Sequence, residues 1–140
     1  MRTYDQLVRL HEYRLHEKQK ALAVLEAESN AIKLRADELL AEMLIEEARA
    51  EESQLGLVSF AGYFLRASET RRTLDEAKGS VDRKILSARQ VLKAAFNELK
   101  RIETLRDRKR AELEAETRHL EQAALDEVAV AQHHRRADKT

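Results

Sequence analysis

Two long series of apolar residues, spaced alternately by three and four positions, constrain this sequence more than any other feature. This spacing places apolar side chains in one stripe along a helix, as in a coiled coil. The first series is Val8, Leu15, Leu22, Leu25, Ile32, Ala36, Leu39, Met43 and Ala50, with polar residues at His11, Lys18, Ser29 and Glu46. The second is Phe60, Phe64, Ala67, Leu74, Val81, Ile85, Ala88, Leu92, Ala95, Leu99 and Ile102, with polar residues at Arg71 and Lys78. Since the 140 residues contain no proline and only 3 glycines, each series predicts one long helix.

The stretch SQLGLVS, residues 53–59, separates the two series and predicts the turn between the helices. Gly56 can adopt the left-handed conformation that ends a helix, and Ser59 can cap the next one. The second series keeps its phase through Gly79, so we expect the helix to continue there. The sequence therefore predicts an all-α, antiparallel two-helix coiled-coil hairpin forming a single domain, residues 1–140. Its first helix covers about 3–53, its turn about 54–59 and its longer C-terminal helix about 60–137.

An antiparallel hairpin with this turn fixes which residues face each other. The numbers of facing residues add up to about 113, which places Val8 near Leu105. From about residue 108 onward the second helix has no facing partner. The three-four series is about half polar there, although this part of the chain keeps apolar residues at Leu113, Leu120, Leu125, Val128 and Val130. We therefore expect this part of the helix to bind another protein.

Composition excludes several classes of function. The chain has 26 basic and 26 acidic residues, so no broadly basic surface for nucleic acid is indicated. It has no cysteine, which excludes disulfides and thiolate chemistry. The longest apolar patch, residues 55–65, is too short to span a bilayer, and charged residues interrupt the N-terminal apolar pieces. We expect a cytoplasmic helical protein. The basic cluster RDRKR, residues 106–110, is surrounded by acidic residues, which favours an acidic protein surface over nucleic acid as its partner.

No motif indicates catalysis, a metal or a cofactor. In HEYRLH, His11 and His16 are five residues apart, whereas the zinc pattern on a helix needs histidines four apart. The many carboxylates of an extended coiled coil lack a concave pocket that would shift their pKa values. We expect a protein that is not an enzyme. A metal-dependent enzyme on a helical scaffold is the alternative from another class.

Three of the chain's six aromatic residues lie in SFAGYFLRAS, residues 59–68. Phe60 and Phe64 belong to the second series, which predicts that they pack in the core near the turn. Tyr63 falls outside the series. We expect it to be exposed and to anchor an interface.

Taken in order, these features resemble the flagellar export proteins of the FliJ family. The resemblance lies in the opening MRTYDQLVRLHEYRLHEKQKAL, in FAGYFL after the turn, and in ELKRIETLRDRKRAELEAETRHLEQAALDEVA near the end. The pattern Glu-Gln-x-x-Leu-Asp-Glu, here at residues 121–127, is typical of the family's last helix, as is the leucine- and arginine-rich segment 99–110. The similarity covers nearly the whole chain.

The resemblance implies a non-catalytic stalk of the flagellar type III export apparatus, similar in fold to the central stalk of rotary ATP synthases. The implied partners are the hexameric export ATPase FliI, the membrane export gate FlhA and export chaperones. The implied location is cytoplasmic, peripheral at the inner face of the cell membrane at the flagellar base. An injectisome-type secretion stalk and a generic coiled-coil adaptor are the alternatives.

The resemblance also assigns residues to the two partners. The gate-contacting positions correspond to Tyr63 and Ala67, together with Phe60 and Phe64; Ala67 is smaller than the residue the family usually has. The positions implied to contact the ATPase are Arg101, Arg106, Arg108, Leu120, Asp126 and Glu127.

Overall fold

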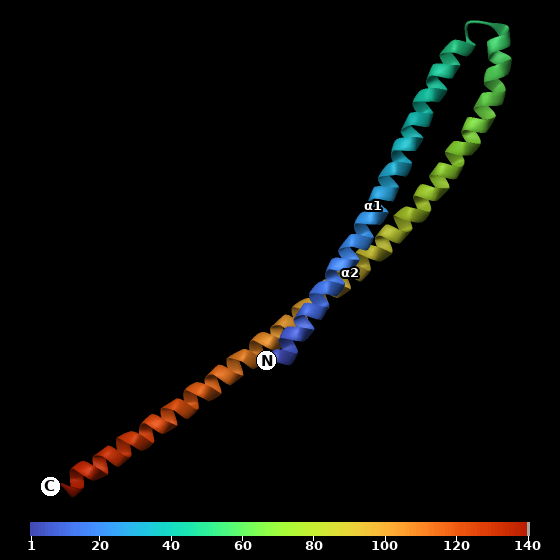
Figure 1. Cartoon of the computed structure of the whole chain (residues 1–140). Helices are drawn as coiled ribbons and strands as arrows, with labels where there is room; N and C mark the ends of the chain where they lie inside the picture. The colour runs from blue at the N-terminus through green and yellow to red at the C-terminus, as the bar shows by residue number, and fades with distance from the viewer. Residues whose placement is uncertain (140) are drawn as a thin grey trace. The chain divides into compact units, whose positions relative to one another are not determined.

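The computed structural model describes residues 1–139 as two long helices joined by a short turn (Figure 1). Helix α1 spans Arg2–Ala50 and helix α2 spans Gln54–Asp138. No strand occurs in the described part of the chain. The two helices pack against each other in antiparallel directions, and α2 is the longer of the two, which confirms the predicted all-α hairpin.

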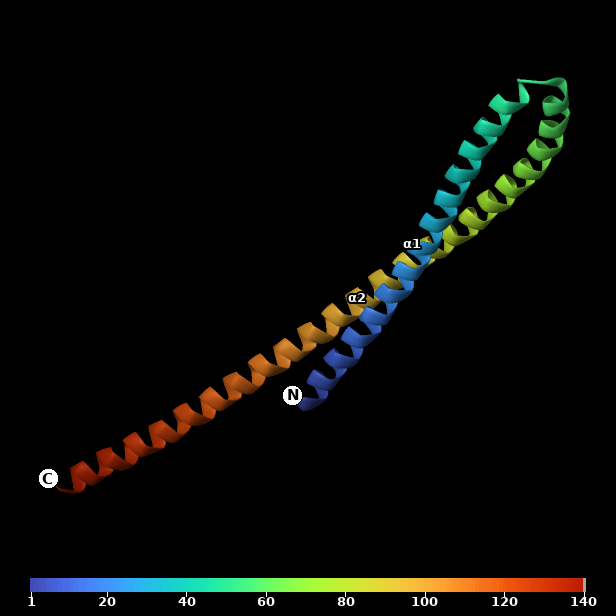
Figure 2. The ribbon, with the colours of Figure 1, turned by 45° about the horizontal axis from the view of Figure 1, so that its top comes forward.

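Contacts divide the chain into two units. One unit is Arg14–Ala95, which includes the turn, and the other is Met1–Tyr13 together with the chain from Phe96 onward. In each unit a segment of α1 lies beside a segment of α2, as both ribbon views show (Figures 1 and 2).

The turn lies at residues 51–53, earlier than predicted. The Ser53 side-chain oxygen accepts a hydrogen bond from the backbone N–H of Gly56 at 2.9 Å, which is the geometry of a helix N-cap. Ser53, not Ser59, therefore caps α2, and Gly56 lies inside its first turn. No glycine among residues 1–139 has a positive φ, so the predicted left-handed conformation of Gly56 is wrong.

Gly56 is nevertheless required for its size. A Cβ at this position would lie 2.9 Å from the Ser53 side-chain oxygen and 3.1 Å from the carbonyl oxygen of Ala50. The missing side chain lets the start of α2 approach the end of α1. Close approach, and not an unusual backbone conformation, explains a glycine at this point.

The predicted apolar series lines the interface in both units. Within residues 1–139, each of its apolar members except Phe64 is buried or half-buried. The buried members are Val8, Leu39, Met43, Ala50, Ala67, Val81, Ile85 and Leu99. No large side chain of the described chain is less than 2% exposed, so solvent reaches the edges of this interface.

The register agrees with the expected antiparallel pairing. In the unit that contains the turn, Ser29 hydrogen-bonds to Asp82, and the two numbers add up to 111. In the other unit, the Arg110 guanidinium lies 4.0 Å from the Asp5 carboxylate, and those numbers add up to 115. The predicted sum of about 113 for facing residues lies between these values.

Helix α2 continues well past its contacts with the start of α1. Every residue from 107 to 139 is exposed, and the helix runs to Asp138. We call residues 107–139 the C-terminal segment; it is drawn in orange to red in Figure 1. The predicted unpaired stretch is present, but it begins later than residue 108, because Arg110 still lies 4.0 Å from Asp5 and Leu113 and Thr117 line a groove with Met1.

Candidate partner-binding surfaces

The aromatic side chains near the turn do not lie on the sides of α2 that the sequence predicted. Tyr63 packs against the buried cluster of Leu39, Met43 and Ala67, and its hydroxyl is buried without a hydrogen-bond partner in the described chain. Phe64 is 46% exposed, although its ring centre lies 5.9 Å from that of Phe60. The predictions that Tyr63 is exposed and that Phe64 lies in the core are therefore both wrong.

A helix with 3.6 residues per turn accounts for this exchange. A strict seven-residue repeat drifts by about 20° per heptad relative to 3.6 residues per turn. Over the three heptads that separate Phe60 from Val81, the drift reaches roughly 60°, more than half the angle between adjacent residues. The inward position near the turn therefore shifts from Phe64 to Tyr63.

Ala67 is not accessible either. It is 3% exposed and belongs to the same buried cluster as Leu39 and Met43. Of the four residues assigned to the export gate by resemblance, Phe64 is exposed, Phe60 and Tyr63 are half-buried, and Ala67 is buried. A partner at this end of the hairpin would meet other side chains first.

A different apolar surface is exposed on the first turns of α2. Leu55, Val58 and Leu65 are 78%, 73% and 71% exposed. By the helical repeat, Val58 and Leu65 lie on the side of α2 opposite Tyr63 and Ala67, and Leu55 borders them. We call Leu55, Val58 and Leu65 the outer stripe.

The outer stripe was missed in the sequence, although a signal for it exists. Residues 54–65 contain no charged residue, in a chain that is 37% charged. A helix that is apolar on all sides is normally covered on all sides. Since α1 covers only one side here, the outer stripe is a candidate surface for a second protein.

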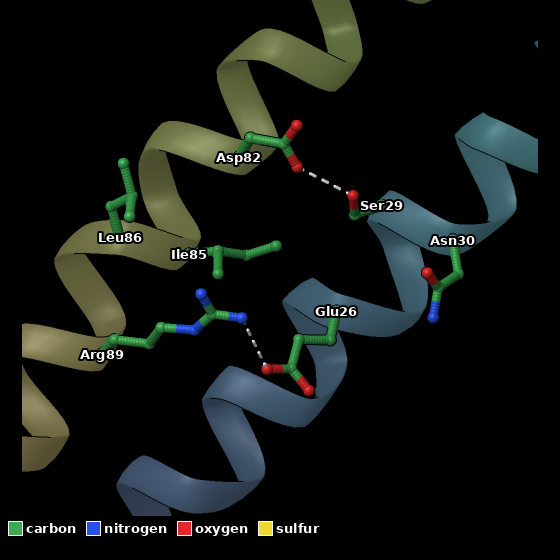
Figure 3. Close-up of a pocket in the computed structure, with 7 residues that line it drawn as sticks. All are labelled: Glu26, Ser29, Asn30, Asp82, Ile85, Leu86 and Arg89. Atoms are coloured by element: carbon green, nitrogen blue, oxygen red, sulfur yellow. Dashed lines mark hydrogen bonds and ion pairs between the residues drawn. The ribbon is translucent and has the colours of Figure 1, made fainter.

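A group of polar contacts links the two helices in the middle of the unit Arg14–Ala95 (Figure 3). The Ser29 hydroxyl donates to one oxygen of Asp82 at 2.8 Å, and the Lys78 ammonium donates to the other at 2.7 Å. Nearby, Arg89 lies 3.6 Å from Glu26. The hydrogen bonds from Lys78 and then from Ser29 lower the pKa of the Asp82 carboxyl.

These polar contacts border an open groove between the helices. The groove is lined by Glu26, Ser29, Asn30, Asp82, Ile85, Leu86 and Arg89. Each carboxylate in it already faces a cation, and Ser29, 8% exposed, has its hydrogen bond to Asp82. A polar pair within an apolar seam fixes the register of a coiled coil. We therefore interpret the contacts along this groove as the feature that fixes the register of the two helices. We call the contacts of Asp82 with Ser29 and Lys78 the register contact.

The basic residues assigned to the ATPase differ in their availability. Arg106 is half-buried and lies 3.3 Å from Asp107, whereas Arg101 is exposed and lies 3.8 Å from Glu98. Arg108 is exposed and forms no ion pair within residues 1–139. Arg108 is thus the most available cation of the three.

The C-terminal segment carries the remaining assigned residues, and all of them are accessible. Leu120 is 62% exposed, and Asp126 and Glu127 are exposed. The Asp126 carboxylate accepts a hydrogen bond from the side chain of Gln122 at 3.1 Å. Further exposed apolar side chains in this segment are Leu113, Leu125, Val128 and Val130.

The chain matches no family model, no curated protein and no solved structure. In the described helices no stretch combines the length and the apolar character needed to cross a membrane. Residues 1–139 contain no group of three or more His, Asp or Glu side chains arranged to hold a metal ion.

Proposed function

We propose that this chain is a non-catalytic stalk of the flagellar type III export apparatus. In this proposal the C-terminal segment enters the hexameric export ATPase, and the end of the hairpin that carries the turn contacts the membrane export gate. The same protein escorts export chaperones. The protein works in the cytoplasm, held at the inner face of the membrane at the flagellar base by its partners, and it needs no cofactor.

The observation that carries the proposal is the exposure of the whole C-terminal segment. An isolated helix is only marginally stable in water, because propensity alone contributes little. Yet this segment keeps apolar side chains, among them Leu113, Leu120 and Val128, at helical spacing and open to solvent. A helix of this kind gains stability when another protein covers those side chains. A segment that enters a ring-shaped partner fits that requirement.

The accessible residues define which contacts the proposal uses. At the ATPase end these are Leu120, Asp126 and Glu127, together with the exposed cations Arg101 and Arg108. At the gate end the outer stripe, and not Ala67, supplies the accessible apolar surface. Tyr63 supports that end of the hairpin from its inner side.

The test measures ATP hydrolysis by the purified export ATPase of the same organism, with and without this protein. The full chain is expected to bind the ATPase and to stimulate hydrolysis, and a form truncated after Arg110 is expected to do neither. A Leu55→Ser/Val58→Ser variant is the matched control, because it changes the outer stripe and leaves the C-terminal segment intact. Equal stimulation by the truncated form, or none by the full chain at any ratio, would rule out this function.

The same design separates the alternative of an injectisome-type stalk. That alternative shares the hairpin and the unpaired segment, and it predicts stimulation of an injectisome ATPase in preference to the flagellar one. A generic coiled-coil adaptor predicts stimulation of neither.

A further inference from the structure

The C-terminal segment carries a mostly apolar stripe in phase with the hairpin interface. Its positions follow one another at spacings of three and four, which places them on one side of the helix. They are Leu113, Thr117, Leu120, Ala124, Val128 and Ala131, and all are exposed. We call them the C-terminal stripe. By the helical repeat they lie on the same side of α2 as Leu99 and Ile102, which pack in the interface.

The stripe begins where the contacts with α1 end. An open groove at this point is lined by Met1, Asp5, Arg110, Leu113, Glu114, Thr117, Arg118 and Glu121. Leu113 and Thr117 thus lie beside the first residues of α1 and also start the uncovered stripe. A second helix placed on the stripe would lie on the same side of α2 as α1, which covers that side in the residues preceding the stripe.

Both edges of the C-terminal stripe are acidic. Glu114 and Glu121 lie along one edge, and Glu116 and Glu127 lie along the other. All four are exposed, and none forms an ion pair within residues 1–139. Arg118, the single lysine or arginine between 112 and 132, lies roughly 120° around the helix from the centre of the stripe, outside the edge formed by Glu114 and Glu121.

This charge pattern excludes a second copy of the chain as the preferred occupant. Residues that flank the seam of a coiled coil face the flanking residues of the partner helix and decide partner choice. Because both edges carry glutamates alone, parallel and antiparallel self-pairing each bring glutamate against glutamate. Like charges at these positions disfavour pairing.

We propose that the C-terminal stripe pairs with a helix of another protein that carries leucines at its seam and lysine or arginine along both edges. Pairing buries the stripe and places a cation opposite each glutamate, as the hairpin interface already does between Arg89 and Glu26. The inference rests on the proposed function only for which protein carries the basic helix; the pairing chemistry rests on the stripe and its edges.

Two synthetic helical peptides test the pairing with the full chain. Both have leucine at the two seam positions of each heptad; one has lysine at the flanking positions, and the other has glutamate. Fluorescence anisotropy is expected to show binding of the lysine peptide at least about tenfold tighter than the glutamate peptide, since four exposed charge pairs change from repulsive to attractive. This preference is expected to shrink as salt is raised. Equal binding of the two peptides would overturn the inference.

Matched variants locate the contact on the helix. Leu120 and Leu125 are 62% and 64% exposed, but only Leu120 belongs to the stripe. Leu120→Asp is therefore expected to weaken binding of the lysine peptide at least about tenfold, and Leu125→Asp is expected to leave it within about twofold, because only the first change removes a buried contact. Both changes place the same residue in an exposed helix, so circular dichroism should show equal helicity. Equal loss in the two variants would place the contact elsewhere.

A second pair of variants tests the acidic edges. Glu114→Lys/Glu121→Lys reverses one edge, whereas Glu112→Lys/Asp126→Lys makes the same change in net charge away from the stripe. Only the first is expected to lower the preference for the lysine peptide. Equal effects of the two would show that the peptide responds to net charge alone and would overturn the inference. So would sedimentation showing that the full chain dimerises and that Leu120→Asp abolishes the dimer.

The ATPase assay distinguishes this inference from the proposed function. Stimulation of the ATPase without discrimination between the peptides refutes the inference and keeps the function. Discrimination between the peptides without any response of the ATPase refutes the function and keeps the inference.

Discussion

Tyr63 offers the sharpest test of how the hairpin end is packed, because its ring and its hydroxyl have opposite effects on stability. The ring packs against Leu39, Met43 and Ala67. Truncation of a fully buried aromatic ring to alanine costs about 3–5 kcal/mol, and this ring is half-buried. Tyr63→Ala is therefore expected to lower the free energy of unfolding by about 2 kcal/mol.

The hydroxyl of Tyr63 is buried without a hydrogen-bond partner in the described chain. A hydroxyl buried in this way costs about 1–3 kcal/mol in proteins. Tyr63→Phe keeps the ring and removes the hydroxyl, so it is expected to raise the free energy of unfolding by about 1 kcal/mol.

Urea denaturation of the full chain, followed by circular dichroism, measures both changes. Phe64→Ala is the matched control, because Phe64 is the adjacent aromatic residue and is 46% exposed; its loss should cost clearly less than that of Tyr63. A Tyr63→Phe variant that is less stable than the wild type would show that the hydroxyl is hydrogen-bonded. A larger cost for Phe64→Ala than for Tyr63→Ala would show that the two side chains were assigned to the wrong sides of α2.

The remaining predictions concern the glycines and the register contact. Gly79→Ala is expected to stabilise the chain by about 1 kcal/mol, since alanine is the better helix former and its Cβ would lie 3.6 Å from the Arg83 side chain, an ordinary van der Waals contact. Gly56→Ala is expected to be destabilising, because its Cβ would lie 2.9 Å from the side-chain oxygen of Ser53; equal midpoint shifts in urea for the two variants would contradict this reasoning. Asp82→Asn is expected to lower the urea midpoint at pH 7, where the wild-type carboxylate holds Lys78. Folding lowers the pKa of the Asp82 carboxyl. Its contribution to the free energy of unfolding is therefore complete above the unfolded pKa of about 4, and it is lost as the pH falls from there through the lower pKa of the folded state. The difference in urea midpoint between the wild type and Asp82→Asn should thus be smaller at pH 3 than at pH 7. An unchanged difference would be inconsistent with a stabilising Asp82 carboxylate.

Most of the fold follows from apolar spacing alone. The series from Val8 to Ala50 and from Phe60 to Ile102 marks the interface because burial in a two-helix hairpin has only one seam to fill. The unpaired C-terminal segment follows in turn from the unequal lengths of the two arms. Both features depend on periodicity over many residues, so an error of a few residues at the turn does not affect them.

The turn itself depends on a choice between local signals. Ser53 and Ser59 are both good N-caps, and Gly56 is both a helix terminator and a residue that a helix can contain. The spacing of apolar residues does not decide between Ser53 and Ser59 as the N-cap, or between Gly56 outside and inside the helix. The contact of Gly56 with Ser53 and Ala50 does so, because it requires the two helix ends to be close in space.

The exposure of Leu120 was predicted correctly, whereas that of Tyr63 and Phe64 was not. Leu120 belongs to a stripe that no other described part of the chain covers, so its exposure follows from the lengths of the helices. The sides taken by Tyr63 and Phe64 depend on a rotation smaller than one residue, which a seven-residue repeat does not resolve. The outer stripe could have been found from the absence of charge in residues 54–65.

Amide hydrogen exchange of the full chain, alone and with the export ATPase, tests the central claim most directly. Alone, residues 114–139 should exchange much faster than residues 14–95, because a helix without packed neighbours opens readily. With the ATPase bound, protection should increase in residues 114–139 and remain unchanged in residues 14–95. Slow exchange of residues 114–139 in the free chain, or no gain in their protection on binding, would contradict the account.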